Sequence, residues 1–500
     1  MSSPNPPAAT LRSQLLARKS IDSLQADAEG AHGFKRTLGA MDLVLLGIGA
    51  IIGTGIFVLT GHAAAANAGP AVALSFIIAG VASVFAGLCY AEMASMIPVA
   101  GSAYTYAYAT LGEFVAWMIG WDLILEYLVA AATVSVGWSG YVGAFVHHVT
   151  GSPIPKQWSN APLVWVKDNA NFVGGHFGAT GDFVNFPAVL IVLAVTAVLI
   201  FGIRESARFN AVIVFIKLAV VLAFVAFGIK FVSPDNWHPF IPPNEGTFGR
   251  FGISGLFQGA SVVFFSYIGF DAVSTAAQET RNPQRDLPIG ILGSLGICTV
   301  LYIAVSLVLT GIVPFAQLNV PHPIALGIAA TGIGWLETAV EVGAIAGLTS
   351  VMLVMLMGQP RIFFSMALDG LFPQVATKIH PRFGTPYVTT IVTGIICAVA
   401  GGVIPIDILS QLTSIGTLFA FAIVSVGVMV LRIREPHRPR VFRVPGGAFV
   451  VPLAGVLSSM VLMYATTTET MLRLAVWLAI GLVIYFSYSR KRSKLRTLGR

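Results

Sequence analysis

The chain has 500 residues, of which 56% are hydrophobic and only 10% are charged. Its mean hydropathy is +0.82. A soluble globular protein carries roughly 25% charged residues. This composition therefore excludes a soluble domain and predicts an integral membrane protein.

Apolar runs long enough to cross a bilayer recur along most of the chain. Each crossing helix needs about 20 residues. The runs predict an all-α polytopic membrane protein with twelve transmembrane helices, and a transporter domain over residues 34–488. They lie near residues 41–60, 70–92, 114–141, 187–203, 208–230, 253–279, 289–313, 336–360, 387–404, 407–431, 449–466 and 470–488.

The placement of positive charge predicts the orientation. With the N-terminus inside, the cytoplasmic segments hold 23 of the 29 Lys and Arg residues, as the positive-inside rule requires. This placement argues against nucleic-acid binding despite the net charge of +7. We expect a multi-pass protein of the cell membrane, in a bacterium the inner membrane, with both termini cytoplasmic.

The two ends of the chain differ from the rest. Residues 1–33 are polar and lack an apolar core before a cleavage site, so we expect a disordered cytoplasmic segment without a signal peptide. The basic tail, residues 489–500, is expected to contact anionic membrane lipid.

The first run carries four glycines, Gly47, Gly49, Gly53 and Gly55. Each weakens a helix by about 1 kcal/mol relative to alanine. Helix packing against small residues accounts for one or two of them, but less well for Gly53-Thr54-Gly55. Non-helical backbone at membrane depth must be buried in protein or line a cavity, where its amides and carbonyls bind polar groups. The motif predicts a broken first helix and a carrier.

The sixth run repeats this feature. Residues 266–271 place polar and glycine residues at a similar depth. Because five spans separate the two breaks, the second repeat must be inverted. We expect repeats over about 41–230 and 253–431, followed by trailing helices over 449–488. The connectors near residues 97–102 and 314–335 either cover the two mouths of a central pathway or are ordinary loops. No role follows for the external loop 147–186.

Four ionisable residues lie inside the predicted spans, where such residues mark function by default. Lys217 lies about nine residues, roughly 14 Å, from the cytoplasmic start of its span. It either takes part in proton coupling or forms a structural ion pair. Asp122 and Glu126 share a face of the third helix. Glu126 pairs with Lys217, holds water or meets a cationic substrate group, whereas we expect a structural role for Asp122. Asp271 either caps the inner half of the sixth helix or bonds across to the first.

The three cysteines, Cys89, Cys298 and Cys397, all fall inside spans. Their spacing fits neither a disulfide framework nor a zinc site. We expect no metal and no cofactor, with a proton as the coupling ion.

Residues 49–57 (GAIIGTGIF), the stretch from Tyr90 to Tyr108, residues 269–275 (GFDAVST) and residues 358–361 (GQPR) together form a specific combination. They resemble the amino acid–polyamine–organocation superfamily, in particular bacterial members of its cationic amino acid transporter family. The resemblance covers residues 34–488. It implies a five-plus-five inverted repeat with broken helices 1 and 6, two C-terminal helices, and an amino acid as substrate.

The resemblance also implies roles for individual residues. The substrate carboxylate would meet the amides of Gly53, Thr54 and Gly55. Its ammonium would meet the carbonyls of Ile51, Phe265 and Ile268. Phe265 resembles the aromatic gate over the substrate, and Met355 resembles the residue that closes the side-chain pocket. Lys217 resembles the lysine that replaces a sodium site in proton-coupled members. Glu126 and Asp271 match the acidic positions of spans 3 and 6.

The predicted substrate departs from the family name. Methionine at position 355 is bulky and apolar, so it would shorten the pocket. Glu126, the other side-chain-pocket candidate, could favour a cation unless Lys217 or water occupies it. We predict proton-coupled import of small or broadly chosen L-amino acids by alternating access. The alternative is a uniporter or exchanger of arginine and lysine. Oligomeric state does not follow from the sequence.

Residues 137–140 (GWSG) resemble the motif of intramembrane serine proteases, a different class of protein. Such an enzyme needs a base beside Ser139, normally a histidine. All nine histidines fall in tails, loops or span ends. We therefore predict that the protein is not an enzyme. A channel or an amino acid sensor is the remaining alternative, which a saturating substrate flux would exclude.

Overall fold

The computed structural model describes residues 15–22, 24, 37–97, 102–167, 175–201 and 207–497. It contains eight helices long and apolar enough to cross a membrane, and four shorter apolar helices. A polytopic, mostly helical membrane protein is therefore confirmed, whereas twelve spans remain a prediction. Residues 98–101 of the first connector, Gly174 of the long loop, most of the segment 1–33 and residues 498–500 of the tail lie outside the described residues.

Every predicted apolar run overlaps a helix. The principal helices are α3 (Ala40–Ile51), α5 (Val72–Met96), α7 (Glu113–Ile124), α8 (Ala130–Thr150), α9 (Phe186–Phe201), α10 (Ala207–Gly228), α11 (Gly252–Val263), α13 (Pro283–Ile312), α15 (Gly334–Leu368), α16 (Tyr387–Val403), α17 (Ile406–Arg434), α18 (Val450–Tyr464) and α19 (Thr468–Ile484).

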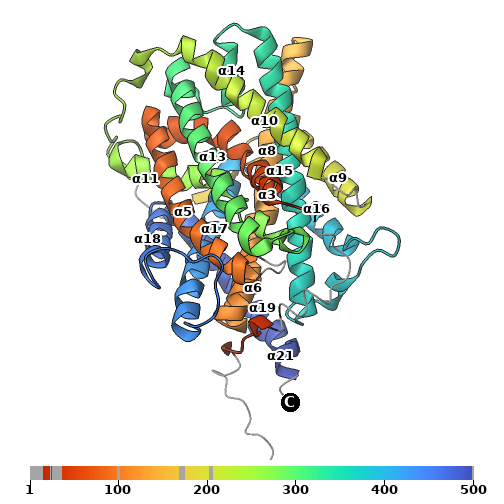
Figure 1. Cartoon of the computed structure of the whole chain (residues 1–500). Helices are drawn as coiled ribbons and strands as arrows, with labels where there is room; N and C mark the ends of the chain where they lie inside the picture. The colour runs from red at the N-terminus through yellow and green to blue at the C-terminus, as the bar shows by residue number, and fades with distance from the viewer. Residues whose placement is uncertain are drawn as a thin grey trace, which may run out of the picture.

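The helices form one bundle around α3, α13 and α15 (Figure 1). Helix α13 packs against α5 and α3, and α15 packs against α8 and α10. Helices α9 and α16 lie together on one side of the bundle, and α17 carries α18 on the other. The central position of α3 buries seven of its twelve residues, so the interruption that follows it lies inside protein.

Two short helices lie at opposite ends of the bundle (Figure 1). Helix α6 (Ser102–Thr110) contacts α12 (Ala272–Thr275), which follows the break in the sixth span. Helix α14 (Pro323–Ala329) contacts the helical turn η1 (Gly55–Leu59) and α4 (Thr60–Ala63), which follow the break in the first. In the described residues, the chain is helical from Ser102, where the first connector ends, and the second connector contains α14. This reciprocal arrangement is what an inverted repeat would produce, and the repeat stays a prediction.

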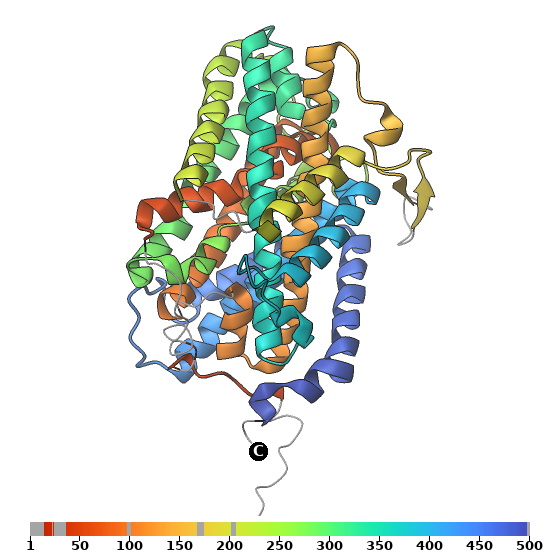
Figure 2. The same ribbon diagram turned by 90° about the vertical axis from the view of Figure 1, so that its right-hand side faces the viewer.

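The long loop after α8 contains a small antiparallel hairpin. Strands β1 (Leu163–Lys167) and β2 (Gly175–Ala179) pair with Leu163 opposite Ala179. The hairpin projects from the side of the helical body (Figure 2). The Arg473 guanidinium lies 4.6 Å from the ring centre of Trp165, a cation–π contact that ties the hairpin to α19.

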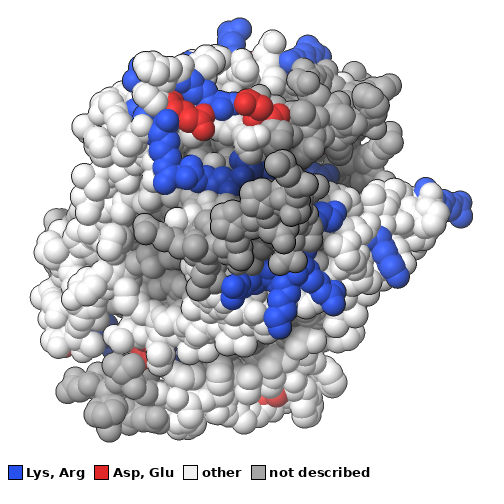
Figure 3. Space-filling view, turned by 90° about the horizontal axis from the view of Figure 1, so that it is seen from below, with Lys and Arg blue, Asp and Glu red and all other residues white. Residues whose placement is uncertain are grey.

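Lys and Arg side chains gather on the end of the molecule that carries the C-terminus (Figure 3), in keeping with the predicted orientation. Residues 15–22 and 24 lie against this end. Lys19 Nζ is 3.1 Å from Asp369 Oδ1, and Ile21 and Leu24 are buried. This part of the segment expected to be disordered therefore makes defined contacts.

Replacing Gly55 with alanine tests how closely the two interrupted spans approach each other. A Cβ at position 55 would overlap the Cα and side chain of Ser266. Overpacking of this kind costs about 1–3 kcal/mol, so Gly55→Ala should lower the unfolding temperature of the detergent-solubilised protein. Gly296→Ala is the matched control, because a Cβ there meets nothing within 4 Å. Equal unfolding temperatures for the two variants would contradict the close approach.

Candidate functional site

The first span is interrupted directly after α3. Ile52 is extended, with φ −72° and ψ 99°, and the helix resumes at η1. Within the described chain, the backbone N–H groups of Gly53, Thr54 and Gly55 donate no hydrogen bond to another backbone group. The first N–H groups of a helix have no partner of their own and attract anions. The interruption therefore presents three amides that suit a carboxylate, and their contact with the substrate carboxylate stays a prediction.

The sixth span is interrupted at a matching place. The turn η8 (Phe264–Tyr267) ends at Ile268, which is extended with φ −63° and ψ 136°. Gly269 follows with φ +115°, a backbone conformation that favours glycine. A Cβ there would lie 2.9 Å from the carbonyl of Ala50. Glycine is needed at position 269 both for its conformation and for the close approach of the first span.

Tyr302 of α13 joins the two interruptions. Its hydroxyl lies 2.9 Å from the carbonyl oxygen of Ile51 and 2.7 Å from that of Ser266. The ring is fully buried. Sequence reasoning missed this residue. The available signal was a tyrosine in the middle of an apolar span, since a buried phenol hydroxyl usually finds a partner.

Two hydroxyl groups beside the interruptions have no partner. Thr54 Oγ1 and Ser266 Oγ are buried and make no hydrogen bond within the described chain, and Ser266 lies directly against Gly55. Buried polar atoms are normally satisfied. Together with the three amides, they leave a set of polar groups that a small zwitterion can satisfy.

The carbonyls predicted to meet the substrate ammonium are partly engaged. Ile51 accepts from Tyr302, and the carbonyl of Phe265 accepts from the amide of Ile268 at 3.2 Å. Each carbonyl keeps a second lone pair. The arrangement thus permits the predicted contact with all three carbonyls and does not test it.

Lys217 is fully buried in α10. Its Nζ lies 2.7 Å from the carbonyl oxygen of Gly49 and 3.1 Å from that of Ile52. These carbonyls belong to the C-terminal end of α3, where the helix dipole favours a cation. No hydrogen bond joins Lys217 to Glu126, because both Glu126 oxygens lack partners in the described residues. Lys217 therefore stabilises the interrupted end of α3 rather than a carboxylate on span 3.

The acidic residues form a second cluster nearer the C-terminal end of the molecule. Asp271 Oδ2 accepts from the Tyr127 hydroxyl at 2.7 Å and from Ser102 Oγ at 3.2 Å. Its side chain neither caps α12 nor bonds to the first span, so the partners expected from the sequence were wrong. The physical reason is that Tyr127 and Ser102 offer buried hydroxyl donors from segments remote in sequence.

Glu126 and Asp122 are buried on span 3 without hydrogen-bond partners in the described residues. Glu126 interacts electrostatically with Asp271. Gly137, on the same span, packs against Thr54. Eleven residues of helix separate Glu126 from Gly137, or about 16 Å. Glu126 is thus a neighbour of Asp271, and its place in the side-chain pocket stays a prediction.

The apolar candidates are buried near the interruptions. Phe265 lies in η8 and Met355 in α15, and both are buried. Val351, one turn before Met355, lies against Gly53. A Cβ added at Gly53 would lie 3.1 Å from Val351 Cγ2. At this contact α15 presents an aliphatic side chain to the first interruption.

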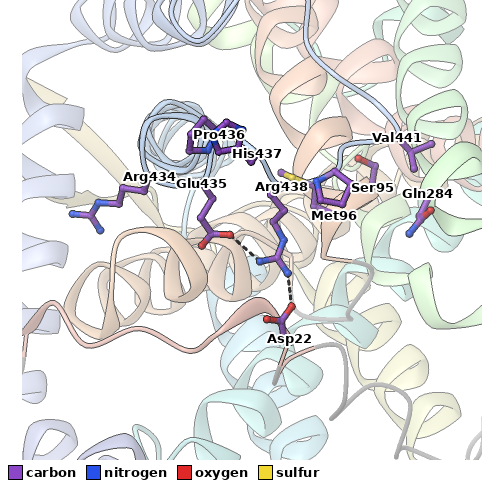
Figure 4. A pocket seen from close by; sticks show the side chains of 11 residues that line it. Asp22, Ser95, Met96, Gln284, Arg434, Glu435, Pro436, His437, Arg438 and Val441 are labelled. Atoms are coloured by element: carbon purple, nitrogen blue, oxygen red, sulfur yellow. Dashed lines mark hydrogen bonds and ion pairs between the residues drawn. The ribbon is translucent and has the colours of Figure 1, made fainter.

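A separate pocket of about 710 Å³ opens at the C-terminal end of the molecule. Its lining includes Arg434 at the end of α17, His437 and Arg438 just after it, and Asp22 from the N-terminal segment (Figure 4). Arg438 bonds to Asp22 at 2.6 Å and to Glu435 at 2.8 Å. These ion pairs tie the N-terminal segment to the bundle, and the pocket shares no residue with the interruptions.

Near the C-terminal end of α5, a buried ion pair lies at the same end of the molecule. Glu92 is fully buried and bonds to Arg432, to Arg440 Nε at 3.2 Å and to the amide of Val444 at 2.8 Å. Two guanidinium groups and an amide satisfy the carboxylate, as a buried charge requires.

Ser139 lacks a catalytic base. Its hydroxyl donates to Asn185 Oδ1 at 2.6 Å, and an amide oxygen does not activate a nucleophile. The geometry therefore gives no support to the protease alternative.

The fold and the two interruptions define a polytopic membrane protein with a buried polar site inside the helical bundle. A model of the amino acid permease family matches residues 38–486, and the chain belongs to this family.

Curated relatives agree with the family assignment. The chain is similar to a branched-chain amino acid permease of Bacillus subtilis, with 48% identity over 97% of this chain and 100% of the relative. It is similar to a methylthioribose transporter of the same species, with 44% identity over 97% and 99%. It is also similar to a vacuolar cationic amino acid transporter of Arabidopsis thaliana, with 38% identity over 84% and 68%. The matching proteins are permeases and transporters, which confirms that the protein is not an enzyme.

Tyr302→Phe tests the bridge between the interruptions. Removing the hydroxyl deprives two buried carbonyls of a donor, which should lower the free energy of unfolding by about 1–3 kcal/mol. Chemical denaturation in detergent measures the change. Tyr464→Phe is the control, because Tyr464 is 76% exposed. A Tyr302→Phe protein as stable as the control would show that the bridge contributes nothing.

Proposed function

We propose that the protein is a secondary transporter that imports L-amino acids by alternating access, coupled to protons. Its preferred substrates are small or branched aliphatic amino acids. The observation that carries the proposal is the set of three unbonded amides at Gly53, Thr54 and Gly55, beside the unpartnered hydroxyls of Thr54 and Ser266. An amino acid carboxylate satisfies these donors at the positive end of a half-helix.

The apolar surroundings support an aliphatic substrate side chain. Val351 lies against Gly53, and Met355 and Phe265 are buried beside the two breaks. A relative 48% identical to this chain is a branched-chain amino acid permease, which agrees with such a pocket.

The cationic alternative requires an acidic partner for the substrate side chain. The candidate is Glu126, but it lies about 16 Å along span 3 from Gly137, which packs against Thr54. This alternative requires Glu126 to meet the side chain of an arginine whose carboxylate lies at the amides. The similarity to cationic amino acid transporters is weaker in identity and coverage, and we rank this alternative second.

Lys217 is proposed as the coupling residue. Its ammonium stabilises the carbonyls of Gly49 and Ile52 at the end of α3. Loss of its proton would remove the charge that favours these contacts and would release the first span from α10. Glu126 and Asp271 are proposed to carry the proton on the side of the breaks that faces the C-terminal end.

Uptake into proteoliposomes tests the proposal. Radiolabelled leucine, alanine and arginine are supplied with and without an inward proton gradient. We expect saturable accumulation of leucine or alanine only with the gradient, and little arginine. Arginine uptake alone would support the cationic alternative. Uptake that is the same with and without the gradient would indicate exchange or facilitated diffusion. A flux that does not saturate with substrate would indicate a channel. The absence of any flux would indicate a sensor.

Lys217→Ala in the same assay separates coupling from binding. We expect accumulation against a gradient to be abolished, while the purified variant still binds the amino acid. Lys230→Ala is a control, because Lys230 is exposed at the end of the same span. If Lys217→Ala still accumulates substrate, Lys217 is a structural residue and the coupling assignment is wrong.

A further inference from the structure

Three side chains of types that bind metals in proteins meet where α8 ends and α15 begins. His148 lies in the last turn of α8, and Glu337 and Glu341 lie near the start of α15. One ligand atom from each residue lies within 4.8 Å of the other two. His148 Nδ1 is 3.1 Å from Glu341 Oε2 and 3.9 Å from Glu337 Oε1. These helix ends lie side by side at the end of the molecule opposite the C-terminus (Figure 2).

The charge of this cluster is not balanced by a permanent cation. In the described chain, neither Glu337 nor Glu341 pairs with a lysine or arginine, and His148 is the partner of both. Glu341 has a side chain only 2% exposed. A buried carboxylate is normally paired or bound to metal. Two carboxylates one turn apart on a helix also repel each other.

We propose that His148, Glu337 and Glu341 form a binding site for a divalent transition metal, with Zn²⁺ as its best-fitting occupant. A tetrahedral zinc ion with bonds of 2.0–2.2 Å holds its ligand atoms about 3.4 Å apart. The atoms already lie at 3.1, 3.9 and at most 4.8 Å. Small side-chain rotations bring them to that spacing.

The ligand set decides the kind of metal. An imidazole nitrogen with two carboxylates suits zinc and its first-row neighbours, whereas magnesium and calcium prefer oxygen ligands throughout. His148 and Glu337 keep side-chain exposures of 31% and 26%, so solvent reaches the site and water fills the fourth position. The ion would link α8 to α15, away from the interruptions.

Zinc binding to the tag-free, full-length protein in detergent tests the site. After treatment with a chelator and buffer exchange, zinc chloride should raise the unfolding temperature by at least about 2 °C, because a ligand that binds only the folded state stabilises it. Added chelator should reverse the shift. Titration calorimetry should give one zinc per chain, and magnesium chloride should give no shift.

Single substitutions locate the binding. Glu341→Gln and His148→Ala should each weaken zinc binding at least about 10-fold, since each removes a ligand. His147→Ala is the matched control, because its side chain is the neighbouring exposed imidazole and lies outside the cluster. It should bind zinc as the unmodified protein does.

His148 is exposed, so His148→Ala should fold. This variant can therefore test the site even if Glu341→Gln fails to fold. Uptake without zinc should be unchanged in His148→Ala, because the cluster shares no residue with the proposed transport site. No zinc-dependent shift in the unmodified protein would overturn the proposal. So would an equal shift in His148→Ala, which would leave the cluster as a histidine–glutamate ion pair.

Discussion

The site depends on the close approach of two non-helical segments in the interior of the bundle. Gly55 leaves no room for a side chain against Ser266, and Gly269 lies against the carbonyl of Ala50. Backbone outside a helix carries unsatisfied polar groups, which are costly away from water. The single hydrogen of the Tyr302 hydroxyl is shared between carbonyls on both segments. The amides of residues 53–55 donate no backbone hydrogen bond in the described chain.

The charged groups around the interruptions are held by different kinds of partner. The Lys217 ammonium is fixed to carbonyls at the end of α3, on the opposite side of the break from the amides. The carboxylate of Asp271 is held by hydroxyl groups. Because the amides face no carboxylate among these groups, the electrostatic attraction of the site for an anion is preserved.

Local patterns in the sequence predicted much of this arrangement. Gly53-Thr54-Gly55 predicted the first interruption because two glycines so close together weaken the helix in the middle of an apolar span. The apolar runs predicted where the helices lie, because a helix that crosses the lipid bilayer needs a long apolar segment. The burial of Lys217 followed from its depth within its span.

The partners of these residues could not be predicted in the same way. Asp271 is held by Tyr127 and Ser102, which are 144 and 169 residues away in the chain, and no local pattern encodes such contacts. Tyr302 bridges segments from two other spans, and Lys217 bonds to backbone carbonyls, which have no residue-type signature. The sequence left the nature of the connectors open, and the contacts of α6 with α17 are long-range packing that no local pattern encodes.

The central claim is that the amides of Gly53, Thr54 and Gly55 bind the substrate carboxylate. Binding of leucine and of leucinol, in which a hydroxymethyl group replaces the carboxylate, tests it most directly on the purified protein. Hydrogen bonds to a charged group contribute about 1.5–3 kcal/mol, so leucinol should bind at least about 10-fold more weakly. Leucinol that binds as tightly as leucine would contradict the account.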